Sequence, residues 1–163
     1  CQQELHKWGA ANQVAFDASK ESQHIISSSD PSGGEFKMLG VIFDTDLSMA
    51  AAISELVSAA GWKLRTLLRT LGFYTEADLA ILYKAHLVSF IEYRTPAIYH
   101  ATRAVLVRLD AVQSGSLRDI GIDEVAALAH FHLAPLSTRR DIAMLGLIHR
   151  TSMGTGSQQF HYF

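Results

Sequence analysis

The strongest constraint on this 163-residue chain is a run of apolar residues at helical spacing in its first half. From Asp46 onward, apolar residues recur every three or four positions, which places them on one side of a helix. Asp46 or Ser48 is the expected N-cap, and Gly72 is the expected end. The sequence therefore predicts a long amphipathic helix whose apolar side other elements must cover. The apolar positions are Ile53, Leu56, Val57, Ala60, Leu64, Leu67, Leu68 and Leu71.

A second helix is expected to begin at Thr75. The Thr75 hydroxyl can cap the helix while the Asp78 carboxylate reaches back to the backbone of the cap. Pro96 forbids continuation, because proline has no N–H and its ring clashes with the preceding turn. The side chains that this helix is expected to bury are Leu79, Leu82, Tyr83, Leu87 and Phe90.

Glycine and proline also divide the remaining chain into helices. A third helix is expected over residues 101–118 and ends at Gly121. Asp123 can cap a short fourth helix, Pro135 breaks the chain again, and a last helix is expected to start near Thr138. The sequence therefore predicts four or five helices in its C-terminal two thirds.

The segment before these helices has a different pattern. Residues 4–14 are expected to form the tail of a helix, whereas residues 23–27 and 36–43 are short apolar runs typical of strands. A Ser/Gly-rich stretch at residues 27–34 joins the two runs as a loop. Together these patterns predict two strands connected by a flexible loop.

The predicted fold class is therefore α+β and mainly α-helical. Residues 1–45 are expected to hold a terminal helix and a two-stranded β-hairpin, and residues 46–150 a helical bundle. Residues 151–163 are expected to be a flexible tail.

Composition narrows the setting. Apolar residues make up 48% of the chain, enough for a core, but no stretch approaches the roughly 18 to 20 unbroken apolar residues of a membrane span. Cys1 is the only cysteine, which excludes an internal disulfide and a multi-cysteine zinc site. The chain opens without methionine or a targeting signal. We expect an intracellular piece of a larger protein, in the nucleus or cytoplasm, with no membrane association.

Charge is divided unevenly along the chain. Residues 1–59 carry three basic and eight acidic side chains, whereas residues 60–163 carry eleven basic and eight acidic ones, and nine of those eleven are arginine. Arginine suits forked contacts with phosphate. The excess is modest, however, and a solvated helix surface is the competing interpretation.

No complete catalytic or metal-binding motif is present. The sequence has no Gly-x-Ser-x-Gly elbow, and Gly33-Gly34 precedes a strand and lacks the Lys-Ser/Thr pair of a phosphate loop. His130 and His132 are two positions apart, so they point in different directions on a helix, and no third ligand is close in sequence. We therefore expect no metal or cofactor in this chain.

One set of side chains indicates nucleic-acid binding. Trp62, Arg65 and Arg69 fall on the side of the long helix opposite its leucines. An aromatic plate beside two guanidinium groups suits a nucleic-acid backbone. The alternative is that Trp62 packs under another segment while the two arginines are simply solvated.

Several stretches occur in the order and spacing found in one polymerase family. Trp8 and Asn12 precede Phe16-Asp17 and Lys20, and residues 36–44 form an apolar run with a central glycine. Farther along are Leu82-Tyr83-Lys84 and Ile91-Glu92-Tyr93, then Leu109-Asp110, Val112-Gln113, Leu117-Arg118, Leu136 and Arg139-Arg140. From about residue 8 to residue 150, the chain resembles the C-terminal palm and thumb portion of the reverse transcriptases of non-LTR retrotransposons.

The resemblance implies a role for each stretch. Lys20 falls where the family has its motif D lysine, close to the leaving pyrophosphate, where an ammonium can act as a general acid. Residues 36–44 resemble the primer-grip hairpin, with Phe36, Lys37, Leu39 and Gly40 as candidate nucleic-acid contacts. The helices after Asp46 resemble the thumb, which lies across the template-primer duplex.

The same resemblance implies what this chain does not do alone. The palm aspartates that hold two Mg²⁺ ions in the family have no counterpart here, so we expect no polymerase activity from the isolated chain. Its expected partners are an RNA–DNA or RNA template-primer duplex and the upstream fingers and palm of the same polyprotein. The alternative function is that of a non-catalytic helical interaction module or a degenerate retroelement product.

Overall fold

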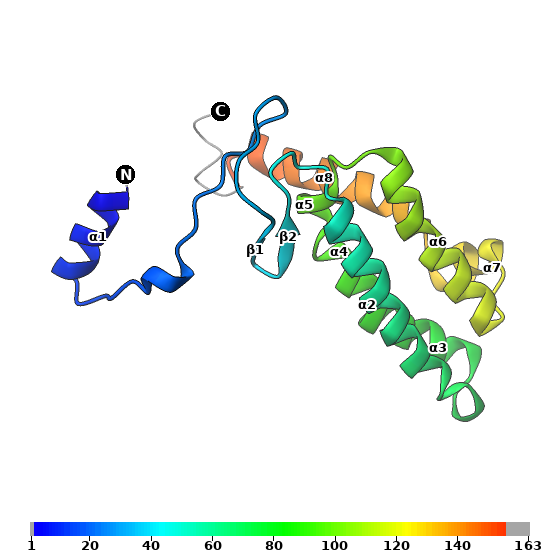
Figure 1. Cartoon of the computed structure of the whole chain (residues 1–163). Helices are drawn as coiled ribbons and strands as arrows, with labels where there is room; N and C mark the ends of the chain where they lie inside the picture. Colours follow the sequence, from blue (N-terminus) through cyan, green and yellow to red (C-terminus); the bar gives the residue numbers. More distant parts are fainter. Residues whose placement is uncertain (1, 156–163) are drawn as a thin grey trace.

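The computed structural model describes residues 2–155, which form an N-terminal arm, a β-hairpin and a body of helices (Figure 1). The arm holds α1 (Gln2–Ala11) and the 3-10 turn η1 (Ala18–Lys20), and it lies apart from the helical body. The hairpin consists of β1 (Phe36–Met38) and β2 (Val41–Phe43), paired antiparallel. The body comprises α2 (Ala50–Leu68), η2 (Leu71–Phe73), α3 (Glu76–Tyr83), the π-helical turn η3 (Lys84–Val88), α4 (Ser89–Glu92), α5 (Thr95–Ile98), α6 (Arg103–Ile120), α7 (Glu124–Phe131) and α8 (Leu136–Ser152).

The chain is thus mainly helical with a two-stranded antiparallel sheet, as predicted. Within residues 2–155, no helix combines the length and the apolar character needed to cross a bilayer. Helix α8 continues to Ser152, two residues into the predicted tail, and the rest of that tail from residue 156 lies outside the described residues.

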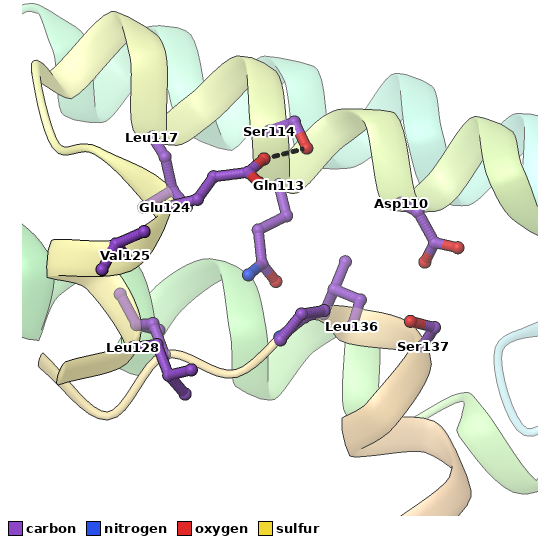
Figure 2. A pocket seen from close by; sticks show the side chains of 11 residues that line it. Asp110, Gln113, Ser114, Leu117, Glu124, Val125, Leu128, Leu136 and Ser137 are labelled. Atoms are coloured by element: carbon purple, nitrogen blue, oxygen red, sulfur yellow. Dashed lines mark hydrogen bonds between the residues drawn. The ribbon is translucent and has the colours of Figure 1, made fainter.

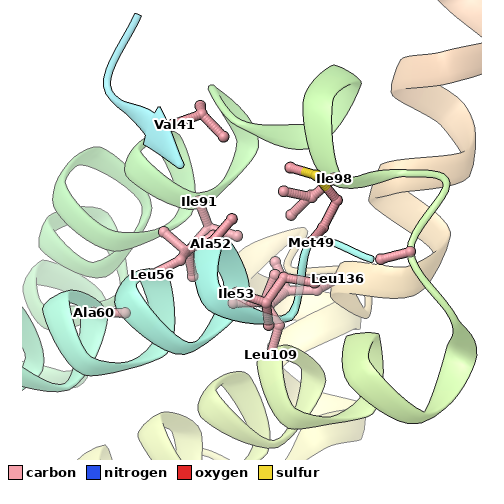
Figure 3. Close-up of a cluster of buried hydrophobic side chains, with 11 residues drawn as sticks. Val41, Met49, Ala52, Ile53, Leu56, Ala60, Ile91, Ile98, Leu109 and Leu136 are labelled. Carbon is pink, nitrogen blue, oxygen red and sulfur yellow. The ribbon is translucent and has the colours of Figure 1, made fainter. Parts of the chain in front are cut away.

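Helices α2 and α6 pack along each other and bury the predicted leucine side of α2. Figure 3 shows that side chains from α2, the segment after α3, α6 and the start of α8 converge on one core. Each large aliphatic side chain buried in this way contributes about 1.5 to 3 kcal/mol. The fully or nearly fully buried members are Met49, Ala52, Ile53, Leu56, Ala60, Ile91, Ile98, Leu109 and Leu136.

A second core lies toward the other end of α2. It joins Leu67 of α2 to residues of α3, η3, the C-terminal end of α6 and α7. Tyr83 is its largest fully buried side chain. The two cores together explain why α2 is amphipathic along its whole length. The other members are Leu79, Ala80, Leu87, Val88, Leu117, Ile120, Ile122, Ala127 and Leu133.

Several predicted helix boundaries are confirmed by their caps. Thr75 and Asp78 form the expected capping box at the start of α3. Gly121 ends α6 in the left-handed conformation, and the Asp123 carboxylate accepts hydrogen bonds from the first turn of α7. Pro96 does end the second helical segment, but it also opens α5, because a missing N–H is harmless in the first turn of a helix.

The start of α2 differs from the prediction. Its N-cap is Met49, which is left-handed and makes no side-chain cap. Asp44 and Ser48 satisfy this end together: the Asp44 carboxylate accepts from the Ser48 hydroxyl at 2.6 Å and from the Met49 N–H at 3.4 Å, and the Ser48 hydroxyl accepts from the Ala50 N–H at 3.4 Å. Helix α8 likewise starts at Leu136, earlier than the expected Thr138, because Pro135 occupies the N-cap.

The prediction that residues 23–27 and 36–43 form two strands is also wrong. Residues 23–27 form no strand; Ile25 makes only an isolated bridge to Ser32. The hairpin forms instead within residues 36–43, which reverse direction at Leu39 and Gly40. The Ser/Gly-rich loop therefore precedes the hairpin.

Two arginines anchor α8 to the rest of the body. The guanidinium of Arg140 donates to both carboxylate oxygens of Asp110 on α6, at 2.6 and 3.0 Å. Arg139 forms an ion pair with Glu92 at the end of α4. These pairs fix the direction in which α8 leaves the body.

Candidate nucleic-acid interface

The exposed side of α2 carries Trp62, Arg65 and Arg69 in a line, here called the α2 stripe. Successive helical residues turn by about 100°, so these positions lie opposite the buried Leu56 and Ala60. All three side chains are exposed, and Trp62 retains 62% of its surface. The predicted placement is confirmed, and the alternative in which Trp62 packs under another segment is not. Contact with nucleic acid stays a prediction.

Neither arginine of the α2 stripe is neutralised by a carboxylate within residues 2–155. The Arg65 guanidinium lies over the Trp62 ring, 5.4 Å from its centroid, and Arg65 Nε donates to the carbonyl of Gly61 at 3.3 Å. The remaining guanidinium donors face solvent. Such donors beside an aromatic ring suit phosphate and sugar.

The hairpin presents Leu39 and Gly40 at its tip. Both residues have positive φ, 50° and 79°, as a two-residue type I′ turn requires. Glycine adopts positive φ without cost, whereas the Cβ atom makes this conformation unfavourable for leucine. The Leu39 side chain is 82% exposed. The predicted site residues Leu39 and Gly40 are therefore accessible to a ligand.

The other two hairpin candidates already have partners. The ring of Phe36 stacks on Phe43, with centroids 5.6 Å apart, and lies 4.4 Å from the ring of His24. Lys37 Nζ lies 3.1 Å from a carboxylate oxygen of Glu55 on α2. Phe36 thus supports the hairpin by packing. The Lys37 pair is largely exposed and worth little, so a phosphate can compete for this ammonium.

The Lys37–Glu55 pair joins the hairpin to the same side of α2 that carries the stripe. Glu55 precedes Trp62 by seven residues, which is close to two full helical turns, and Trp62 precedes Arg69 by seven more. At 1.5 Å per residue, this side of α2 extends about 21 Å from Glu55 to Arg69. That length matches roughly six nucleotides of one strand at 3.4 Å each.

A second basic and aromatic surface lies where α2 meets the segment α3–η3–α4. Two cations lie over the Phe90 ring: Lys63 Nζ is 4.8 Å from its centroid and the Arg94 guanidinium 4.4 Å. These three residues help to line a cavity of about 450 Å³, here called the Phe90 groove. Its polar and aromatic lining comprises Lys63, His86, Ser89, Phe90, Tyr93 and Arg94.

A neighbouring cavity of about 410 Å³ shares Lys63 and His86 with the Phe90 groove and adds Tyr74 and two threonines. Of the residues that the structure describes, no acidic one lines either cavity. Both therefore favour an anionic ligand with a flat apolar part.

The sequence pattern does not predict the Phe90 groove, because the residues of the groove come from two helices. The apolar spacing predicts that Phe90 is buried, yet Phe90 is only half-buried. The π-helical turn η3 (Lys84–Val88) inserts one residue into the helix and so changes which side the later residues face. The available signal was local: Phe90 and Arg94 are four residues apart, a spacing that brings side chains together on a helix.

Lys20 is not brought near this surface. It ends η1 on the N-terminal arm, is exposed, and its Nζ lies 3.6 Å from the Asp17 carboxylate. Hydrogen bonds from the side chain and the backbone of Ser19 hold the pKa of Asp17 below its ordinary value. Glu21, next in sequence, pairs with His6 at 2.9 Å rather than with Lys20. The structure therefore separates Lys20 from the other candidates.

No group of three or more metal-ligating side chains occurs within residues 2–155. Asp44 is committed to the start of α2: burial raises the pKa of its carboxyl, but hydrogen bonds from Ser48 and Met49 outweigh that effect and lower the pKa overall. His132 is the left-handed cap of α7, which directs its side chain differently from that of His130.

Comparison with known proteins found no matching protein-family model, no matching curated protein and no matching solved structure.

Proposed function

We propose that this chain is the primer-grip and thumb portion of a reverse transcriptase of the non-LTR retrotransposon type, and that it holds a template-primer duplex. The observation that carries the proposal is the continuous exposed side of α2. There Trp62 is exposed, Arg65 and Arg69 have no carboxylate partner among residues 2–155, and the Lys37–Glu55 pair joins the hairpin to this side of the helix.

The proposed contact is with the sugar-phosphate backbone and not with base edges. Arg65 and Arg69 would meet phosphates, and the Trp62 ring would pack on sugar or on an exposed base. The hairpin tip at Leu39 and Gly40 would lie beside the primer end. Such contacts do not depend on the nucleotide sequence, and a polymerase must bind duplexes of any sequence.

In this proposal, other domains of the parent protein catalyse nucleotide addition. The Mg²⁺-binding aspartates of the family have no counterpart in this sequence, so nucleotide addition would require an upstream palm and fingers. Lys20 would act there as a general acid toward the leaving pyrophosphate. The purified chain alone should therefore extend no primer above a heat-inactivated control.

The test is duplex binding by the double variant Arg65→Ala/Arg69→Ala across several salt concentrations, with two RNA–DNA duplexes of unrelated sequence. Affinity should fall similarly for both duplexes. The slope of log K against log salt should shrink by about two, close to one unit per lost phosphate contact. The melting temperature should hardly change, because both residues are exposed.

The matched control is Arg103→Ala/Arg150→Ala. Both of these arginines are exposed, and Arg150 Nε donates to the carbonyl four residues earlier at 3.3 Å, as Arg65 does. This control removes the same charge from α6 and α8. Equal losses for both double variants would show that only net charge matters and would contradict the proposed interface.

A second candidate function is that of a helical protein-interaction module, and α8 supports it. Ile142, Leu145 and Ile148 recur every three residues on α8 and are each more than 60% exposed. Such an apolar row is typical of a helix that contacts another protein. Binding through this row should respond little to salt, whereas phosphate binding weakens steeply as salt rises.

A further inference from the structure

A pocket of about 360 Å³ lies between α6, α7 and the start of α8 (Figure 2). None of its lining residues belongs to the α2 stripe. Its size is that of a site for one large side chain or small ligand. Most of its wall is apolar. The apolar lining residues are Leu117, Val125, Leu128, Leu133, Pro135 and Leu136.

One polar side chain in this wall has an unmet hydrogen-bonding need. Gln113 of α6 is 6% exposed, and Figure 2 shows its amide between α6 and Leu136. Its Nε2 donates to the carbonyl of Ala134 at 3.1 Å. Its Oε1 is buried and accepts from no donor among residues 2–155. A buried acceptor without a donor costs free energy, and a ligand carrying an N–H recovers it when the Gln113 amide turns Oε1 toward the pocket.

The charge of the pocket separates it from the proposed nucleic-acid surface. In the described part of the chain, no lysine or arginine lines it. Asp110 is paired with Arg140, whereas among residues 2–155 the Glu124 carboxylate accepts only from the Ser114 hydroxyl, at 2.9 Å, and has no cationic partner (Figure 2). Phosphate is therefore repelled, and a positive group next to Glu124 is attracted.

The apolar surface continues outside the pocket, so it is larger than one small molecule would cover. Val125 and Leu128, three residues apart on α7, are 74% and 53% exposed. Both also line the pocket, so their exposed parts continue its apolar wall outward. A peptide can place one side chain in the pocket and its neighbours against this ledge.

We propose that this pocket binds a peptide segment of a partner protein that presents a tryptophan next to a lysine or arginine. The indole supplies an apolar body for the leucine wall and one N–H donor for Gln113 Oε1, without any acceptor to leave unpaired. A lysine in the same place would bury its charge, and a phenylalanine would leave Oε1 unsatisfied. The basic neighbour meets Glu124 at the edge.

The test uses the full chain, labelled with ¹⁵N, and the probe peptide acetyl-Ala-Lys-Trp-Ala amide. Saturable shifts should appear at the Gln113 side-chain amide and at the backbone amides of Val125 and Leu128. Replacing tryptophan by phenylalanine in the peptide should weaken binding by about threefold to tenfold, the range for one neutral hydrogen bond. Replacing lysine by glutamate should weaken it further.

Two protein variants complete the design. Leu128→Arg places a bulky cation at an exposed position, so it should abolish binding while leaving the melting temperature unchanged. Glu124→Gln should remove the preference for lysine in the peptide. Equal binding of the tryptophan and phenylalanine peptides, shifts that map elsewhere, or full binding by Leu128→Arg would each overturn the proposal. Self-association that is lost in Trp8→Ala would overturn it in favour of a second copy of this chain.

Discussion

Replacing Arg140 by methionine should destabilise this protein more than any change on its surface. Arg140 is 5% exposed and makes two charge-assisted hydrogen bonds to Asp110, at 2.6 and 3.0 Å. Methionine keeps much of the volume and apolar contact but leaves the Asp110 carboxylate without its partner. The pair is the link between α6 and the first turn of α8.

The expected magnitude follows from the burial of the two partners. Breaking a fully buried ion pair costs about 3 to 5 kcal/mol, but the Asp110 side chain is 32% exposed and can be partly rehydrated. We therefore expect Arg140→Met to lower the free energy of unfolding by about 2 to 3 kcal/mol. For a chain of this size, the loss corresponds to roughly 5 to 10 °C in melting temperature.

A double-mutant cycle tests the cause. Asp110→Leu added to Arg140→Met removes the unpaired carboxylate, so the double variant should be more stable than Arg140→Met alone. Arg150→Met, on the exposed side of the same helix, should change stability by less than about 0.5 kcal/mol. Urea unfolding followed by circular dichroism gives the free energy of unfolding of the wild type, of Arg140→Met, Asp110→Leu and their combination, and of the Arg150→Met control. An Arg140→Met variant as stable as the Arg150→Met control would refute the reasoning.

Three further predictions concern single side chains. Thr75→Ala should lower the free energy of unfolding by about 1 kcal/mol through loss of the capping box, measured by urea unfolding. Burial raises the pKa of Tyr83 to about 12, so the stability it contributes should be present below about pH 10 and be lost between about pH 10 and pH 12; Tyr83→Phe should flatten this loss in alkaline melts. Hydrogen bonds from Thr75 lower the pKa of Asp78, so its stabilising contribution should be present above about pH 4 and be lost as pH falls further; acid melts of Asp78→Asn should show a smaller loss.

The helices could be predicted because their signals are local. The capping box at Thr75, the glycine after α6 and the Asp123 cap each act within one helical turn of the residue that carries them. The apolar spacing of α2 also predicts its buried side without reference to any partner. The same periodicity places Trp62, Arg65 and Arg69 together on the opposite side.

The strand pairing and the cap of α2 could not be predicted in the same way. Residues 23–27 have strand-forming composition, yet a strand exists only when another strand pairs with it, and residues 36–43 pair among themselves. Leu39 at φ 50° is unfavourable for an isolated residue, so the turn at residues 39–40 is not expected from propensity. The N-cap residue is Met49, and the Asp44 carboxylate and the Ser48 hydroxyl satisfy the backbone N–H groups at the start of α2.

The candidate sites also differ in whether the sequence alone predicts them. By itself, the sequence determined the helical framework and the exposed line of Trp62, Arg65 and Arg69, because both follow from the period of one helix. Only the tertiary structure decided that Lys63 and Arg94 share the Phe90 ring, that Arg140 reaches Asp110 and that Gln113 Oε1, beside a pocket, has no donor within residues 2–155. The contacts of Lys63 with Phe90 and of Arg140 with Asp110 join residues that are distant in sequence. Such contacts depend on how the helices cross and how far each is turned about its axis, which packing sets and local spacing does not record.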